Sequence, residues 1–202
     1  MARAFADLAW PRWTARLSLR PATADDAAAV FAYRRLPEVS AWMTRLPDDK
    51  DRFVAFFVEN LGLTLAIERD GELVGDAMVR VQDAWAQAEV ADRAVGTQAE
   101  LGWCLAPRRL GAGLATEVVH ELLAIAFDGL GVRRIEANCF ADNIGSWRVM
   151  DKVGLRREGY FVAESLHRDG TWRDGISYAL LADEWRARGS ASPAPDSLAT
   201  RD

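Results

Sequence analysis

The feature that most constrains the fold is a glycine-containing turn that lies between a strand pattern and a helix pattern. The turn is residues 108–113, RRLGAG; an apolar run at 99–106 precedes it, and apolar residues recur at helical spacing over 114–130. After two glycines that end the helix, a buried strand is expected at 132–140. A strand, a helix and a second strand in this order form a right-handed crossover between parallel neighbours. The chain is therefore expected to hold one parallel strand pair whose connecting helix begins at a glycine turn.

The same turn predicts an anion site. Glycines let the backbone approach a ligand closely, and a helix N-terminus offers free N–H groups at the positive end of its dipole. Arg108 and Arg109 add charge-assisted donors. We therefore expect a phosphorylated small molecule here, although a turn that merely connects strand to helix also fits the pattern.

Two known phosphate motifs fit the turn poorly. A P-loop needs a lysine directly after its second glycine, and none follows Gly113. A dinucleotide fingerprint needs a third small residue where Thr116 stands, and an acid at the end of the next strand, whereas Glu136 lies in the middle of that strand. Neither a nucleoside triphosphate nor a dinucleotide is therefore favoured.

The remaining patterns predict one mixed domain with a short segment at either end. Residues 1–12 read as an N-terminal arm, 13–188 as the domain, and 189–202, rich in Ser, Ala and Pro, as a disordered tail. Periodicity predicts strands at 15–21, 63–68, 73–81, 155–166 and 172–181, helices at 23–35, 37–43, 48–61 and 143–153, and an irregular excursion at 84–97. The fold class is therefore α/β (α+β), with helices covering a mostly antiparallel sheet of about seven strands.

Composition excludes several function classes. A formal net charge of −5 argues against a nucleic-acid partner. No apolar run is long enough to span a membrane, and the N-terminus lacks a secretion signal. We therefore expect no membrane partner and no export, and we expect the protein to be cytoplasmic. Cys104 and Cys139 fit two reduced core residues, and only two histidines occur. A metal site or a Ser-His-Asp triad is therefore not expected.

Two segments carry a resemblance to a known family. RRLGAG at 108–113 fits the [RQ]-x-x-G-x-[GA] turn of the GNAT acetyltransferase superfamily, and 143–155, NIGSWRVMDKVGL, is similar to its signature N-x-x-S-x-R-V-x-E-K-x-G-F. Asp151 and Leu155 are mild departures. The opening LSLRP at 17–21 also resembles the family, and the likeness extends over 15–186. The serine in N-x-x-S and ELGW at 100–103 resemble the ribosomal-protein N-terminal (RimJ/RimL-like) branch.

The resemblance implies a GNAT fold with a splayed parallel strand pair, and acetyl-CoA as co-substrate without a metal. The turn would hold the pyrophosphate, a backbone N–H near Cys104 and Leu105 would polarise the thioester carbonyl, and the helix at 143–153 would contact the rest of the cofactor. The residues expected to bind acetyl-CoA are Cys104, Leu105, Arg108, Arg109, Gly111, Ala112, Gly113, Leu114, Ala115, Asn143 and Ser146.

The resemblance also implies three catalytic residues. Many members place a tyrosine four positions after the N-x-x-[AS] residue to protonate the departing thiolate, but Met150 stands there, so Ser146 is the expected substitute. Glu164 is the leading candidate for the base that deprotonates the amine, and Glu100 is the second. The alternatives are a surface hydroxyl for Ser146 and a solvated or ion-paired acid for either glutamate.

The expected reaction is acetyl transfer to a primary amine, first of all a protein N-terminal α-amine. A small amine (an amino acid, a polyamine or an aminoglycoside) is the enzymatic alternative, and a catalytically silent CoA-binding sensor is the other. Trp42, Trp85 or Trp172 is expected to line the access for the acceptor, to which 84–97 would also contribute. The sequence leaves monomer and homodimer equally open.

Overall fold

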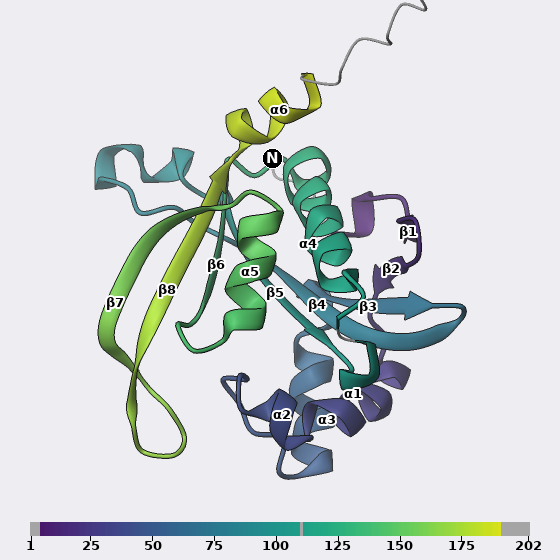
Figure 1. Cartoon of the computed structure of the whole chain (residues 1–202). Coiled ribbons are helices and arrows are strands. Elements are labelled where there is room, and N and C mark those ends of the chain that lie inside the picture. The colour runs from purple at the N-terminus through teal and green to yellow at the C-terminus, as the bar shows by residue number, and fades with distance from the viewer. Residues whose placement is uncertain (1–4, 110, 191–202) are drawn as a thin grey trace, which may run out of the picture.

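One open sheet organises the chain. The computed structural model describes residues 5–109 and 111–190, and these residues form eight strands in the order β1-β2-β3-β4-β5-β6-β8-β7 (Figure 1). Neighbouring strands are antiparallel except β5 and β6, which are parallel. The strands are β1 (Arg12–Trp13), β2 (Ser18–Pro21), β3 (Thr64–Arg69), β4 (Glu72–Gln82), β5 (Gln98–Leu105), β6 (Arg134–Phe140), β7 (Arg156–Leu166) and β8 (Trp172–Leu181).

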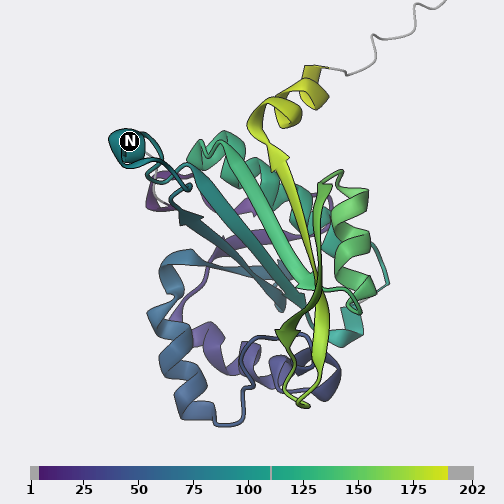
Figure 2. The same ribbon diagram turned by 90° about the vertical axis from the view of Figure 1, so that its left-hand side faces the viewer.

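Helices cover both faces of the sheet (Figures 1 and 2). On one face lie α4 (Leu114–Ala124), its π-helical continuation η6 (Ile125–Leu130) and α5 (Ile144–Lys152), whose apolar side chains join the larger core cluster. On the other lie α1 (Ala27–Arg34), α2 (Pro37–Ser40) and α3 (Lys50–Glu59), which build a second cluster around Ala66 and Cys104. The C-terminal helix α6 (Ala182–Ser190) follows β8.

The 3-10 helix η2 (Ala24–Asp26), which leads directly into α1, shows how local sequence fixes these elements. Thr23 and Asp26 form a capping box in which the Thr23 N–H donates to Asp26 Oδ2 at 2.8 Å. Arg20 on β2 donates both of its terminal nitrogens to the same carboxylate at 2.8 Å. This hydrogen-bonded pairing with Arg20 lowers the pKa of Asp26 and fastens α1 to the sheet.

The parallel pair is the irregular part of the sheet. Strands β5 and β6 pair only through Gln98–Glu100 and Arg134–Glu136; beyond Glu100 they diverge, although each keeps its antiparallel partner on the other side. Main-chain groups of β5 from Leu101 to Leu105 therefore have no partner on β6. This is the splayed parallel pair that the family resemblance implies, and the predicted fold class is confirmed.

The structure adds two short elements that the sequence patterns did not predict. Strand β1 is two residues long, too short for a periodic signal, and α6 has few apolar residues beyond Trp185. The predicted helix at 114–130 is present as α4 and η6, whereas residues 15–17 of the predicted first strand lie in the connection between β1 and β2. The predicted tail, 189–202, falls outside the described residues except for the end of α6.

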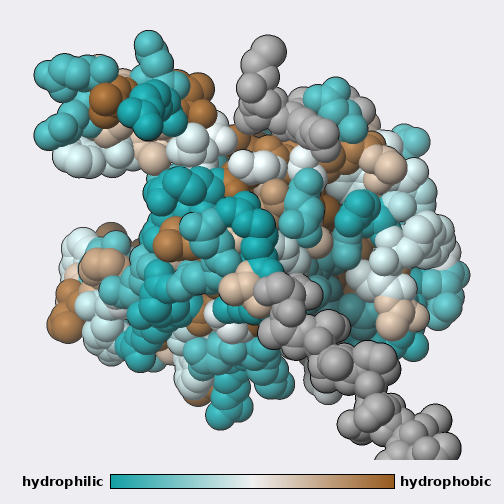
Figure 3. All heavy atoms as spheres, turned by 90° about the horizontal axis from the view of Figure 1, so that it is seen from above, coloured by the Kyte–Doolittle hydropathy of each residue, from teal (hydrophilic) through white to brown (hydrophobic). Residues whose placement is uncertain are grey.

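Two segments differ from the arm and the irregular excursion that the sequence predicts. In the segment 1–12, residues 1–4 lie outside the description, and Phe5, Leu8 and Trp10 pack against the larger core cluster. Residues 84–97 contain the 3-10 helix η4 (Ala88–Arg93) and stand off from the body as the lobe at the upper left of Figure 3. The described part of the N-terminal segment therefore packs on the core, whereas residues 84–97 extend into solvent.

Candidate active site

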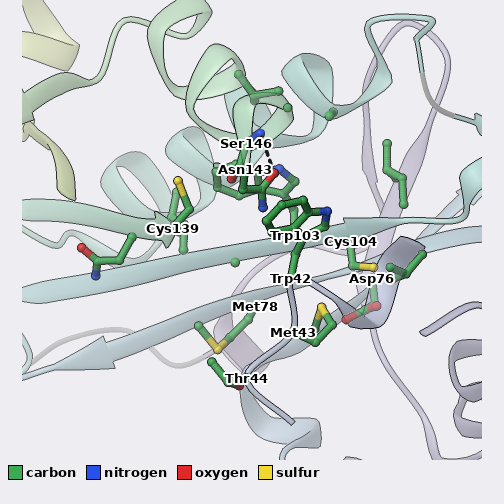
Figure 4. A pocket seen from close by; sticks show the side chains of 18 of the residues that line it. Trp42, Met43, Thr44, Asp76, Met78, Trp103, Cys104, Cys139, Asn143 and Ser146 are labelled. Carbon is green, nitrogen blue, oxygen red and sulfur yellow. Dashed lines mark hydrogen bonds between the residues drawn. The ribbon is translucent and has the colours of Figure 1, made fainter. Parts of the chain in front are cut away.

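A cavity of about 1120 Å³ follows the divergence of β5 and β6. One part, here called the turn end, is lined by Gly111, Gly113, Leu114, Ala115 and the first turn of α5; the other, the hairpin end, is lined by residues 42–45, Met78, Glu100, Phe161 and Glu164. Figure 4 shows that Asn143 and Ser146 lie on one side of the strands, and Met43, Thr44 and Met78 on the other. The cavity therefore reaches both faces of the sheet through the gap between two strands.

The turn end has the form of an anion cradle. Gly111 and Gly113 adopt φ of +83° and +76°, which favours glycine, and Gly113 is the N-cap of α4. The first residues of α4, whose N–H groups lack acceptors within the helix, line the cavity. Arg109 also lines the cavity, and its Nη2 lies 3.1 Å from Glu72 Oε2.

Two predicted residues of the turn lie elsewhere. Arg108 lines a separate small cavity beside α1 and α2 and is exposed there, and Ala112 does not line the main cavity. The structure thus brings Arg109, but not the Arg108 side chain, to the cradle.

A brace from the N-terminal segment holds the turn. Arg16 donates from Nη1 to the carbonyl oxygen of Ala112 at 2.8 Å and from Nε to Glu117 at 2.7 Å. Thr14 Oγ1 donates to the same glutamate at 2.5 Å. Burial alone would raise the pKa of Glu117, but the hydrogen bonds from Thr14 and Arg16 outweigh it and lower the pKa. Sequence reasoning missed this brace, because its partners lie about a hundred positions apart and no motif joins them.

The first turn of α5 brings Asn143 and Ser146 to the middle of the cavity. Asn143 is the N-cap, and its Oδ1 accepts from the Ser146 N–H at 3.2 Å (Figure 4). The Ser146 side chain forms a hydrogen bond with the Cys139 thiol. This bond lowers the pKa of the thiol, but burial has the larger effect and raises it. Met150, one turn further, is buried in the core. The hydroxyl that α5 contributes to the cavity lining is thus that of Ser146.

Glu100 stands where the two strands separate. It is the last residue of β5 that pairs with β6, and its carboxylate accepts from Arg80 on β4 at 3.0 Å. The ion pair leaves the side chain 27% exposed at the cavity wall. The structure therefore places Glu100 at the cavity and, as one of the sequence alternatives proposed, gives it a cation partner.

Glu164 reaches the cavity through a bulge in β7. The pairing with β8 shifts between Phe161 and Ser165, and Ala163 adopts φ of +49°, a conformation that costs free energy in a residue other than glycine. Asp174 on β8 stabilises the bulge by accepting from the Ala163 N–H at 2.8 Å and from the Tyr160 hydroxyl. The bulge directs the Glu164 carboxylate over Gly175, where an added Cβ would collide with Oε2. Ser165 Oγ donates to Glu164 at 2.9 Å.

A buried charge cluster, of which Arg34 and Asp76 belong to the cavity lining, lies beside Cys104. Asp76 on β4 is 1% exposed; it accepts from the Tyr33 hydroxyl at 2.5 Å and from Arg34 Nε at 2.9 Å. Asp76 pairs in register with Cys104, and burial raises the pKa of that thiol to about 12. A buried carboxylate without a cation would be unstable, so the pairing of Arg34 with Asp76 fixes α1 to β4, the neighbour of β5 on the side away from the divergence. A single polar residue in an apolar strand pattern, Asp76, is the signal that could have pointed to it.

The sequence left open which of Trp42, Trp85 or Trp172 lines the access for the acceptor, and the structure separates the three. Trp42 lines the cavity, whereas Trp85 and Trp172 lie outside it and are 90% and 62% exposed. Residues 84–97 do not line it either. Among the described residues no cluster of side chains suits a metal ion, and no described helix has the length and apolarity to cross a membrane.

Comparison with known proteins identifies the family. The model of the acetyltransferase (GNAT) domain matches residues 16–156, more than half of the chain, so the protein belongs to this family of N-acetyltransferases. The uncharacterised N-acetyltransferase YoaA of Bacillus subtilis is 30% identical over 178 residues, which cover 83% of this chain and 94% of YoaA.

Relatives with assigned acceptors are of two kinds. The L-amino acid N-acetyltransferase AaaT of Escherichia coli is 27% identical, over 81% of this chain and 96% of AaaT. The [ribosomal protein uS5]-alanine N-acetyltransferase of the same organism is 29% identical over 42% of this chain and 43% of that enzyme. Some curated relatives thus match over only about half of their own length.

A solved structure supports the fold at similar identity. Mycobacterium smegmatis RimJ, in complex with CoA-disulfide, superposes with a TM-score of 0.66 and 28% identity over 86% of this chain and 89% of that one. The fold that uses acetyl-CoA is therefore shared, while the relatives do not agree on an acceptor.

Proposed function

We propose that this acetyltransferase transfers the acetyl group of acetyl-CoA to a primary amine, first of all the α-amine of a protein N-terminus. The observation that carries the proposal is the continuity of one cavity from the glycine turn, through the gap between β5 and β6, to Glu100 and Glu164. A donor held at one end and an amine held at the other meet in that gap.

The turn end suits the cofactor. The N–H groups of Gly111 to Ala115, with Arg109, would hold the pyrophosphate at the start of α4. Strand β5 beyond Glu100 has main-chain groups free of β6, so it can bond the pantetheine amides. A backbone N–H near Cys104 and Leu105 would then donate to the thioester oxygen, where negative charge develops.

The hairpin end suits the chemistry of the amine. Glu164 takes a proton from the ammonium, and the free amine attacks the thioester carbonyl to form a tetrahedral intermediate. The C–S bond then breaks and the nitrogen gives its second proton to the departing sulfur, so that the amide forms and CoA leaves as the thiol. Ser146 donates a hydrogen bond to the departing sulfur. Glu164 is favoured over Glu100 as the base because Glu100 is already paired with Arg80.

Two alternatives keep specific support. The full-length likeness to AaaT favours an amino acid as acceptor, whereas RimJ/RimL-like motifs and the uS5 enzyme favour a protein N-terminus. A silent CoA-binding sensor is suggested by Met150, which is buried where many relatives carry tyrosine.

An acceptor screen scored by release of free CoA tests the proposal. We expect thermal stabilisation by acetyl-CoA, and CoA release that depends on an N-terminal peptide or a small amine. Stabilisation with no release from any amine would establish the sensor instead, and no stabilisation would overturn the proposed cofactor.

A further inference from the structure

We infer that the acceptor is an α-amine whose own carbon carries a large apolar side chain, such as that of methionine, leucine or phenylalanine. The inference rests on the proposed function and names the class of its acceptor. It follows from the wall that the hairpin end presents next to Glu164.

This wall is apolar and partly open. Trp42, Met43, Met78 and Phe161 line the hairpin end, and Phe53 and Phe56 also line the cavity. Trp42 and Phe161 remain 38% and 46% exposed, although large apolar side chains are stabilised by burial. Figure 4 shows Trp42, Met43 and Met78 gathered next to the strands at the divergence. A ligand with an apolar group would bury these side chains and gain the free energy of that burial.

The charges of the hairpin end fit one cationic amine. The guanidinium groups nearby are engaged: Arg34 with Asp76, Arg80 with Glu100, and Arg45 over the ring of Phe56 at 4.5 Å. Glu164 has a hydroxyl donor but, within the described residues, no basic partner among its recorded bonds. Four other carboxylates line the cavity: Asp76, Glu100 and Asp142 pair with arginines, and Glu38 also borders the small cavity that Arg108 lines. Among the described residues, Glu164 is thus the carboxylate beside the apolar wall that has no recorded cation partner, which suits a single amine better than a polyamine or an aminoglycoside.

The wall is held in place before any ligand binds. The tip of the β7–β8 hairpin contacts the segment that carries Trp42: His167 Nε2 lies 3.1 Å from the Ala41 carbonyl oxygen, and Arg168 donates to the carbonyl of Met43. A fixed aromatic surface favours binding because less conformational freedom is lost on association. Flexible methionines allow several apolar shapes, so we expect a class of side chains rather than one.

A panel of amino-acid amides tests this inference. Glycinamide, alaninamide, leucinamide, methioninamide and phenylalaninamide share the α-amine and differ in the side chain; lysinamide and spermidine add charge. We expect kcat/KM for the best of the three large apolar amides to exceed that of alaninamide by about 30-fold, in the range that apolar pockets provide. Free leucine and the peptide Leu-Gly-Gly then distinguish a metabolite from a polypeptide N-terminus as the source of the same chemistry.

Variants locate the preference in the wall. Trp42→Ala should lower the ratio of kcat/KM for the apolar amides to kcat/KM for alaninamide about tenfold, while the KM for acetyl-CoA is unchanged. Met78→Ala should lower the same ratio to a smaller extent. Trp85→Ala, which removes an equally large but fully solvated indole, is the matched control. Equal or better turnover of alaninamide, lysinamide or spermidine would overturn the inference and leave the proposed function standing. No CoA release from any amine would overturn the proposed function as well.

Discussion

The turn end and the hairpin end of the cavity are built in different ways. Two short segments form most of the turn end and act largely through main-chain N–H groups and helix caps: one contributes Gly111, Gly113, Leu114 and Ala115, and the other is 143–146. The hairpin end draws on the connection between α2 and α3, on β4 and β5, and on a bulged strand far along the chain. A ligand common to a fold family can be held by a short motif, whereas a variable acceptor needs side chains that only the tertiary structure brings together.

The largest effect is expected at the turn. Gly111→Val should reduce acetyl-CoA affinity at least ~30-fold, because a left-handed φ is unfavourable for valine and its side chain would occupy the space where a phosphate approaches. Gly71→Val is the matched control: Gly71 has φ of +80° in the β3–β4 turn, away from the cavity. Calorimetry on both variants separates loss of stability, expected in both, from loss of binding. Equal affinities would show that the turn does not hold the cofactor.

Next in size is the loss of the proposed base. Glu164→Gln should lower kcat about 100-fold, as general-base catalysis commonly contributes, with acetyl-CoA affinity unchanged. Glu100→Gln should have a smaller effect, since Glu100 is held by Arg80. The two variants are compared by steady-state kinetics over pH. The reverse ranking would transfer the role of base to Glu100.

The bulge offers a test that leaves Glu164 itself intact. Asp174→Ala removes the acceptor of the Ala163 N–H and should lower kcat about tenfold, because general-base catalysis needs the base within hydrogen-bonding reach of the proton. Gly175→Ala should act in the same direction by displacing the carboxylate. Asp183→Ala, an exposed acid on α6, controls for lost charge. If kcat is unchanged in both variants, the bulge does not position the base.

A smaller effect is expected from the brace. Arg16→Ala should raise the KM for acetyl-CoA about fivefold, in line with one charge-assisted hydrogen bond, without lowering kcat. Arg12→Ala removes the neighbouring ion pair with Glu121, which does not touch the turn, and should leave KM unchanged.

The brace also has a pH dependence with a defined sign. The hydrogen bonds from Thr14 and Arg16 to Glu117 lower the pKa of that carboxyl below its ordinary value of 4.5 in the folded state, against the opposing effect of burial. Its contribution to stability is therefore complete above pH 4.5 and is lost as the pH falls through the lowered value. Thermal unfolding of the wild type and of Glu117→Gln should converge at acidic pH.

The smallest effects concern the two thiols. Burial raises the pKa of Cys104 to about 12, so the thiol stays neutral and should react slowly with iodoacetamide at pH 8. Cys139 is half-buried at the cavity, and acetyl-CoA should slow its alkylation. Mass spectrometry of the labelled protein measures both rates. Labelling of Cys104 that is faster than labelling of Cys139 would contradict the described burial of Cys104.

The sequence predicted the two ends unequally well. Apolar periodicity located the strands and long helices, and the glycine turn with NIGS at 143–146 led to most of the turn end, since local main-chain geometry follows from local sequence. The Asp174-held bulge, the pairing of Arg16 with Glu117, and the choice of Trp42 over Trp85 depend on contacts between distant segments. The position of the Arg108 side chain, outside the cavity, likewise follows from packing beside α1.

The gap between β5 and β6 also bears on the order of events in catalysis. Because its two sides open onto opposite faces of the sheet, the thioester and the nucleophile can arrive from different directions and occupy the protein together. Neither molecule needs to leave before the other enters, and no covalent acyl-protein is required to bridge two visits. Such an arrangement leads to intersecting, not parallel, lines in double-reciprocal plots when both concentrations are varied.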